Sequence, residues 1–317
     1  MIITDYLRSD PDLQWAYARQ MGVEYAVIRL PEDKDFDCTN EAHWQEIYQR
    51  YVDHGLTPLV LEPMPNHLHE HIKTGDEQRD ACIHQVIRMF PIMDRLGIRT
   101  ICLNFMAHIG WYRSSKQLQE RGGALVTGFR LKDVPAETAQ VISEETLWGN
   151  LYYFLKAVIP AAEQFNIRLA LHPDDPPVSP LGRVSRILTS LQSMHKAVHL
   201  VESPQLGVTL CQGTFRAMGE DLEQVISVFA AERKLFFVHF RDIAGDKTDF
   251  RETFHDNGPT DMARMIRLYR ELGCSVPVRV DHVPTMAGED NANPGYAALG
   301  RLFAIGYLKG LLDGVQV

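Results

Sequence analysis

Eight short apolar segments recur along the whole chain, and each is followed by a stretch with the periodicity of an amphipathic helix. The apolar segments are residues 2–6, 25–30, 58–62, 99–105, 168–172, 207–211, 235–240 and 277–281. The helical stretches lie near residues 11–21, 41–54, 76–96, 144–165, 183–196, 220–234, 259–272 and 293–312. Strict alternation of this kind is typical of βα units around a parallel sheet, and eight units close most naturally as a barrel. We therefore predict an α/β fold, a single (β/α)8 TIM barrel domain over residues 1–317.

A doubly wound open sheet is the main alternative to the barrel. In this chain, however, none of the predicted strands leads into a GxGxxG or GxxxxGK[ST] turn, which such nucleotide-binding sheets often carry. The longest interruption of the βα period spans residues 106–143 and contains Trp111, Tyr112 and Arg113. We interpret this segment as an active-site loop or lid, and a simple surface excursion is the alternative.

Composition limits the partners and the location. The chain is 45% hydrophobic and 23% charged, with a formal net charge of −9 and a pI near 5.8. Non-specific binding to nucleic acid or to an anionic membrane is not expected of so acidic a chain. The five cysteines form no CxxC pair, the first residues lack a basic signal sequence, and apolar runs stay shorter than the roughly 20 residues of a spanning helix. We therefore expect a cytoplasmic protein with a small-molecule substrate and with neither a nucleic-acid nor a membrane partner.

The last four predicted strands end on side chains that can bind a metal. In chain order they end on His172, Cys211, His239 and Asp281. The carboxyl ends of neighbouring barrel strands meet at one rim, so the four side chains should point into one pocket. Imidazole and thiolate ligands favour a transition metal, and a carboxylate keeps Mn²⁺ and Fe²⁺ open beside Zn²⁺ and Co²⁺.

Each of these four residues also has a purely structural explanation when it is taken alone. Cys211 could be a small buried hydrophobic residue, His239 a core histidine, and Asp281 the partner of Arg279 in a salt bridge. Their shared position at four strand ends is what favours the metal site.

A second group of histidines occurs in the sequence Asn66-His67-Leu68-His69-Glu70-His71. These histidines are spaced at i, i+2 and i+4, and no single face of a helix presents all three. We predict a solvated loop after the third strand, from which one histidine could still reach the pocket.

Several segments of the chain resemble the mannonate dehydratase family of metal-dependent, xylose-isomerase-like barrels. The matching segments are Leu61-Glu-Pro-Met-Pro, His69-Glu-His-Ile-Lys73, Leu103-Asn-Phe-Met106, Trp111-Tyr-Arg113, Leu171-His-Pro-Asp-Asp-Pro-Pro177, Thr209-Leu-Cys-Gln-Gly213, Phe237-Val-His-Phe-Arg-Asp242, Val280-Asp-His282 and Asn293-Pro-Gly-Tyr296. They cover most of the chain in the family's order. The HPDDPP string, together with a cysteine between two strand-end histidines, is the most specific of these signals.

The resemblance implies the hydro-lyase reaction of hexuronate catabolism, in which D-mannonate loses water to give 2-keto-3-deoxy-D-gluconate, usually with Mn²⁺. It implies that His172, Cys211, His239 and Asp281 hold the metal, and that His282 and Tyr296 transfer protons. It also implies a homodimer. Dehydration next to a carboxylate requires a stabilised enediolate, a base for the C2 proton and an acid for the C3 hydroxyl, and this chemistry agrees with such a site.

Further polar residues are candidates to bind the substrate. Arg113, Arg241 and Arg279 could hold its carboxylate, although each could equally form an ordinary ion pair at the rim. Asn104 belongs to one of the matching segments. Asp174 lies in the stiff acidic loop after His172, where it could orient a substrate hydroxyl or cap a turn.

Two other functions remain open at this point. A sugar isomerase or epimerase of the xylose-isomerase-like barrels would use the same rim, but such sites usually rely on carboxylate ligands, and Cys211 argues against that reading. A catalytically silent sugar-binding barrel would have no need to keep both His282 and Tyr296 beside a full ligand set.

Overall fold

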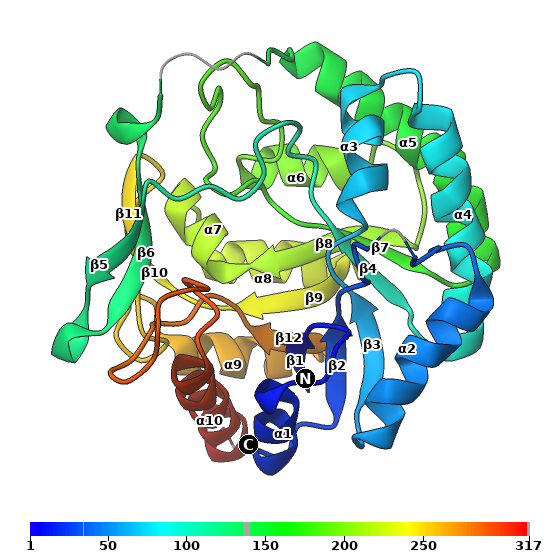
Figure 1. Cartoon of the computed structure of the whole chain (residues 1–317). Helices are drawn as coiled ribbons and strands as arrows, with labels where there is room; N and C mark the ends of the chain where they lie inside the picture. The colour runs from blue at the N-terminus through cyan, green and yellow to red at the C-terminus, as the bar shows by residue number, and fades with distance from the viewer. Residues whose placement is uncertain (34, 136–139, 316–317) are drawn as a thin grey trace.

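The computed structural model describes residues 1–33, 35–135 and 140–315, and its central feature is a closed barrel of eight parallel strands (Figure 1). The strands are β1 (Ile2–Leu7), β2 (Tyr25–Ile28), β3 (Thr57–Leu61), β4 (Thr100–Leu103), β7 (Arg168–Leu171), β8 (Leu206–Cys211), β9 (Leu235–Phe240) and β12 (Pro277–Val280). The first and last strands close the ring, with Ile2 opposite Pro277. All eight predicted strands are present, so the predicted (β/α)8 barrel is confirmed.

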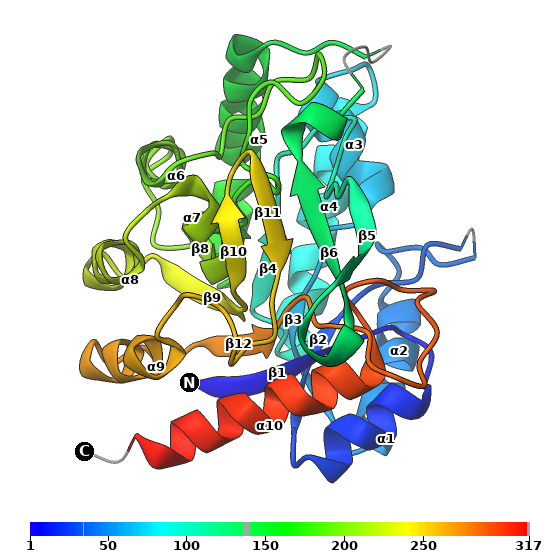
Figure 2. The same ribbon diagram turned by 90° about the vertical axis from the view of Figure 1, so that its left-hand side faces the viewer.

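Helices surround the strands on the outside of the barrel (Figures 1 and 2). They are α1 (Leu13–Gln20), α2 (Glu41–Asp53), α3 (Asn66–Thr74), α4 (Arg79–Leu96), α5 (Glu144–Gln164), α6 (Leu191–Val198), α7 (Gln212–Met218), α8 (Leu222–Ala231), α9 (Met262–Glu271) and α10 (Ala298–Gly314). Several begin at a residue whose side chain accepts a backbone N–H of the first turn, namely Asp12, Asn40, Ser143, Ser190, Asp221 and Asp261. Among the helices of the described residues, none is both long and apolar enough to cross a bilayer.

Some predicted helices differ from those observed. The predictions near 183–196 and 293–312 begin too early, because α6 starts at Leu191 and α10 at Ala298. Helices α3 and α7 were not predicted. The prediction of a solvated loop around His69 is wrong, since this residue lies in α3 with no exposed surface and its ring is 6.0 Å from that of Phe105.

Two of the apolar clusters of the core belong to the barrel and its helices. Val27, Val60, Cys102 and Phe237 come from strands β2, β3, β4 and β9, and their cluster fills the interior of the barrel. A much larger apolar cluster lies between the strands and the surrounding helices. The barrel is therefore a packed scaffold with room for a site only at its rim.

A second sheet lies beside the barrel (Figure 2). Its four antiparallel strands follow the order β10 (Ile243–Asp246), β11 (Asp249–Glu252), β6 (Leu125–Arg130) and β5 (Ser115–Gln119). Phe129 pairs with Phe250 across it, and Gly128 is needed there because a Cβ would lie 2.9 Å from the carbonyl oxygen of Phe250. Strands β5 and β6 lie within residues 106–143, the segment predicted as an active-site loop, of which residues 136–139 fall outside the described part of the chain.

Candidate active site

The carboxyl ends of the barrel strands surround a cavity of about 290 Å³. Its lining includes Tyr6, Glu62, Lys73, Asn104, Trp111, His172, His239, Arg279, Asp281, His282 and Tyr296. These residues come from different βα units and from the loops that follow them. A concave site at this end of a barrel, lined by titratable groups, is the usual setting for catalysis.

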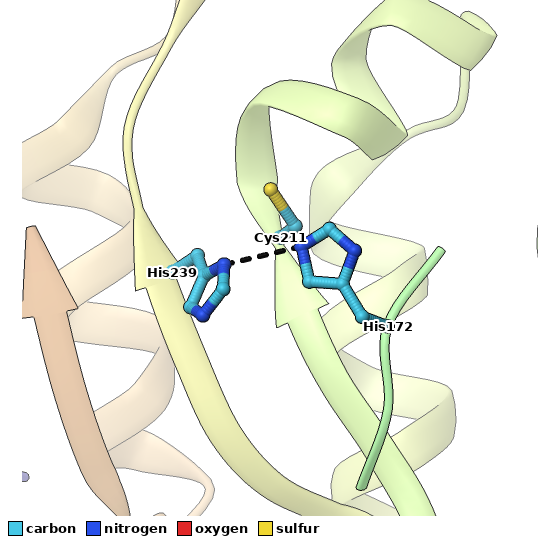
Figure 3. A group of neighbouring side chains, drawn as sticks. All are labelled: His172, Cys211 and His239. Carbon is cyan, nitrogen blue, oxygen red and sulfur yellow. Dashed lines mark hydrogen bonds between the residues drawn. The ribbon is translucent and has the colours of Figure 1, made fainter. Parts of the chain in front are cut away.

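Three of the predicted metal ligands converge at the rim (Figure 3). One ligand atom from each of His172, Cys211 and His239 lies within 4.8 Å of the other two. Cys211 and His239 are register partners on β8 and β9, and His172 directly follows β7. The barrel register therefore accounts for the convergence that the sequence predicted.

The surroundings of the two histidines fix which ring nitrogens face the cluster. The Nδ1 of His172 is 2.6 Å from the carbonyl oxygen of Pro173, which can only accept, so Nδ1 carries a proton. The Nε2 of His239 is 3.0 Å from an oxygen of Glu62, a carboxylate whose pKa Arg279 and His239 lower well below its usual value although burial opposes this. The two nitrogens facing each other, Nε2 of His172 and Nδ1 of His239, are 3.1 Å apart.

This arrangement fits a metal cation. The inner nitrogens of His172 and His239 share a hydrogen bond of 3.1 Å (Figure 3), and a cation between the two rings would take the place of the shared proton. Burial lowers the pKa of His172 and thereby favours the neutral ring that a metal needs. Cys211 is fully buried, and its sulfur accepts from Arg241 Nε and Thr214 Oγ1, each at 3.2 Å.

Asp281, the fourth predicted ligand, lies at the edge of this cluster. Its Oδ2 is 3.6 Å from His239 Nδ1 and 4.0 Å from Cys211 Sγ. Arg279 approaches the other carboxylate oxygen at 2.8 Å. Burial disfavours the charge, but Arg279 and its other cationic neighbours keep the pKa of Asp281 well below its usual value, so the carboxylate stays ionised and close enough to complete a ligand set.

The two predicted proton-transfer residues are in contact at the same cavity. The hydroxyl oxygen of Tyr296 is 3.3 Å from Nε2 of His282, and Nδ1 of the same ring is 3.0 Å from Glu252 on β11. Burial opposes ionisation of Glu252, but Arg241, His282 and Arg113 outweigh it and lower its pKa to about 2. Glu252 therefore accepts the Nδ1 proton of His282 and leaves Nε2 with its lone pair toward Tyr296.

Tyr296 itself is held in its protonated form. Burial and the nearby charge of Asp281 raise its pKa well above the usual value. The ring of Trp111, from the segment predicted as an active-site loop, lies 5.0 Å from the ring of His282. Trp111 thus forms part of the wall around the proton-transfer pair.

The three arginines predicted to clamp a substrate carboxylate are already paired with carboxylates of the protein. Arg113 binds Asp175 through two bonds of 2.6 and 2.8 Å. Arg241 contacts both Asp175 and Glu252. Arg279 bonds to both oxygens of Glu62 at 2.8 and 3.0 Å. The alternative of ordinary ion pairs at the rim is therefore what the structure shows, and these residues position carboxylates instead of offering a free charge.

The other two predicted substrate contacts differ from each other. Asn104 lines the cavity, and its side-chain oxygen accepts the N–H of Met106 at 3.1 Å. Asp174 needs a correction, because it is fully buried and accepts the backbone N–H groups of Ile187 and Leu188 at 3.0 and 2.9 Å. It stabilises the loop after β7, as the alternative of turn capping proposed.

Sequence reasoning missed two carboxylates that organise the site. Glu62 closes the third predicted strand, so its position matched that of the predicted ligands, and the signal was available. Glu252 gave no comparable signal, because it reaches His282 from the second sheet.

Comparison with known proteins identifies the family of this chain. The family model described as D-mannonate dehydratase (UxuA) matches residues 3–140 and 131–317. Mannonate dehydratase of Streptococcus agalactiae serotype Ia is 33% identical, covering 93% of this chain and 91% of the relative. Mannonate dehydratase 2 of Halalkalibacterium halodurans is 32% identical over 83% of this chain and 84% of the relative.

Solved structures extend the comparison. The mannonate dehydratase from Streptococcus suis serotype 2 superposes with a TM-score of 0.90 and 26% identity, covering 99% of this chain and 93% of that one. An L-ribulose 3-epimerase superposes with a TM-score of 0.61 at 14% identity, covering 98% and 94%, which shows a shared fold only. The fold is that of the xylose-isomerase-like barrels, and the rim carries a group of histidine and cysteine side chains that could hold a metal ion. Within that class, the chain belongs to the mannonate dehydratase family.

Proposed function

We propose that this chain is a hydro-lyase that converts D-mannonate to 2-keto-3-deoxy-D-gluconate and water. The observation that carries the proposal is one cavity lined by His172, His239 and the Tyr296–His282 pair. The ligand atom of Cys211 lies within 4.8 Å of those of His172 and His239. Family membership supports the substrate, because the relatives that cover most of the chain are named mannonate dehydratases.

We propose Mn²⁺ as the cation held by His172, Cys211, His239 and Asp281, with Fe²⁺, Co²⁺ and Zn²⁺ as alternatives that the ligand types permit. A divalent cation bound there supplies positive charge for the carboxylate end of the substrate, where negative charge grows as the C2 proton leaves. Arg241 and Arg279 hold the acidic ligand Asp281 in place.

The proton-transfer pair accounts for the rest of the reaction. His282 takes the C2 proton on Nε2, because Glu252 occupies its Nδ1. Tyr296 gives its phenolic proton to the C3 hydroxyl, which leaves as water. The resulting enol tautomerises to the 2-keto acid. The 3.3 Å contact then lets His282 return a proton to Tyr296, so both residues recover their starting states.

We also propose a cytoplasmic location. All five cysteines carry free thiols in the structure, and Cys211 must remain unoxidised to act as a metal ligand. Fractionation of the native cells, with the protein followed by antibody, tests this location.

The reaction is tested on purified protein that has been stripped by a chelator and reloaded with Mn²⁺. With D-mannonate we expect formation of the 2-keto-3-deoxy acid, loss of activity without metal, and a fall of at least about 100-fold in the Cys211→Ser variant. If the protein binds the metal but leaves D-mannonate unchanged, the substrate assignment is wrong.

A further inference from the structure

Most charged groups around the cavity are paired with one another. Glu62, Asp281 and the buried Asp175 contribute carboxylates, and Arg113, Arg241 and Arg279 are paired with them. An anionic substrate needs a cation that is not already neutralised by the protein. The arginines that the sequence suggested do not meet this requirement.

Lys73 meets it. This residue lies on α3 and lines the cavity together with Asn66, Met106 and His172. Its side chain is only 4% exposed, so its ammonium group is shielded from bulk water. A buried lysine of this kind is costly unless it has a functional partner.

The partners of Lys73 within the protein are few. Among the described residues, its ammonium group has one ion pair, with Glu70 at 3.8 Å, which is too long for a hydrogen bond. The other oxygen of Glu70 accepts the N–H of His108 at 2.7 Å. Burial lowers the pKa of Lys73 to about 8, so the amine remains mostly charged at neutral pH. The lysine therefore keeps both its charge and its donors for a ligand.

We propose that Lys73 binds the carboxylate of the sugar-acid substrate and sets the specificity of the site for acids over neutral sugars. This inference rests on the proposed function. It adds a substrate-binding residue and a reason why the site would prefer acids to neutral sugars. The charge also lies where the enediolate develops, so the same contact stabilises the transition state.

Arg29 is the competing cation at the cavity. It also lines the site, but its side chain is 32% exposed and it is paired with the exposed Glu32. A contact to a solvent-exposed arginine discriminates weakly, because water screens the charge. The inner position of Lys73 therefore favours it over Arg29 as the carboxylate contact.

The test compares D-mannonate with its neutral amide, D-mannonamide, in wild-type protein and in Lys73→Met, Lys73→Arg and Arg29→Met, all loaded with Mn²⁺. In Lys73→Met we expect the KM for the acid to rise about 10- to 100-fold, with a smaller loss in kcat, while the Ki of the amide changes less than about 3-fold. Lys73→Arg should recover part of the preference for the acid. Melting temperatures show whether each variant is folded, and methionine fills the same volume without the charge.

The outcomes separate this inference from the function itself. Equal losses for acid and amide in Lys73→Met overturn the carboxylate contact and indicate a hydroxyl contact. If Arg29→Met selectively weakens binding of the acid and Lys73→Met does not, Arg29 holds the carboxylate and the proposed role of Lys73 is overturned. If the wild type does not convert D-mannonate, the function has failed, and calorimetric binding of the same two ligands still decides the role of Lys73.

Discussion

The hydroxyl oxygen of Tyr296 lies 3.3 Å from Nε2 of His282. In the proposed mechanism His282 is the base for the C2 proton and Tyr296 is the acid for the C3 hydroxyl. In Tyr296→Phe we expect kcat to fall about 10²- to 10⁴-fold, while the C2 hydrogen of D-mannonate still exchanges with deuterium from D₂O. In His282→Gln both dehydration and exchange should stop. Proton NMR of recovered substrate measures the exchange, and exchange that persists only in His282→Gln would reverse the assignment.

Glu252 orients the base from outside the barrel. Replacing it in Glu252→Gln removes the carboxylate that fixes the Nδ1 proton of His282, so we expect kcat to fall about 10- to 100-fold with little change in KM. The variant also leaves Arg113 and Arg241 with less compensation, so its melting temperature should fall. Glu120→Gln is the matched control, because Glu120 pairs with Arg251 at 3.5 Å on the same side of the molecule. A similar loss of kcat in Glu120→Gln would show that the effect comes from disturbing the second sheet and not from losing the contact of Glu252 with His282.

Glu62 should control metal affinity. Its oxygen lies 3.0 Å from Nε2 of His239, so Glu62→Gln weakens the orientation of that ligand, and we expect Mn²⁺ to bind about 10- to 100-fold more weakly. Competitive titration against a chelator measures the change. Asp174→Asn serves as control, since Asp174 bonds to the backbone of the loop, and unchanged affinity in both variants would contradict the role of Glu62.

His255 makes the fold sensitive to acid. It is buried with Nε2 2.7 Å from the carbonyl oxygen of Phe240, and burial lowers its pKa from 6.5 to about 4. Between these values the unfolded chain binds a proton that the folded chain does not, so this group has no cost above pH 6.5 and destabilises the fold as the pH falls toward 4. The loss is on the order of 2–3 kcal/mol. Urea unfolding of wild type and His255→Gln across this range should show a smaller slope in the variant.

The sequence was most informative where function follows from the order of elements. His172, Cys211, His239 and Asp281 could be proposed as ligands because each stands at a strand end, and strand ends meet in any barrel of this kind. The ion-pair partners of the arginines could not be predicted in this way. Whether Arg113 holds a substrate or Asp175 depends on which carboxylates lie nearby in space, and Asp175 is 62 positions further along the chain.

Helix α3 illustrates a limit in local reasoning. The three histidines drew attention to a spacing that no helix face satisfies, whereas Leu68 and Ile72, at i and i+4, are buried and do satisfy it. Gly75 ends the helix with a φ of 71°, a left-handed conformation that glycine adopts without strain. Because the segment was predicted as a solvated loop, Lys73 was not considered as a residue of the cavity.

The second sheet joins two hairpins that follow different barrel strands, one at residues 115–130 and one at residues 243–252, through the pairing of β6 with β11. Strand β6 of the first hairpin pairs with the edge strand β11 of the second, and Glu252 is the last residue of β11. A change of length in one hairpin would therefore disturb the pairing of β6 with β11 unless the other hairpin changed with it. Transplanting both hairpins together into a related barrel would transfer Glu252, the partner of His282, and would leave the side chains at the ends of β7, β8 and β9 in place.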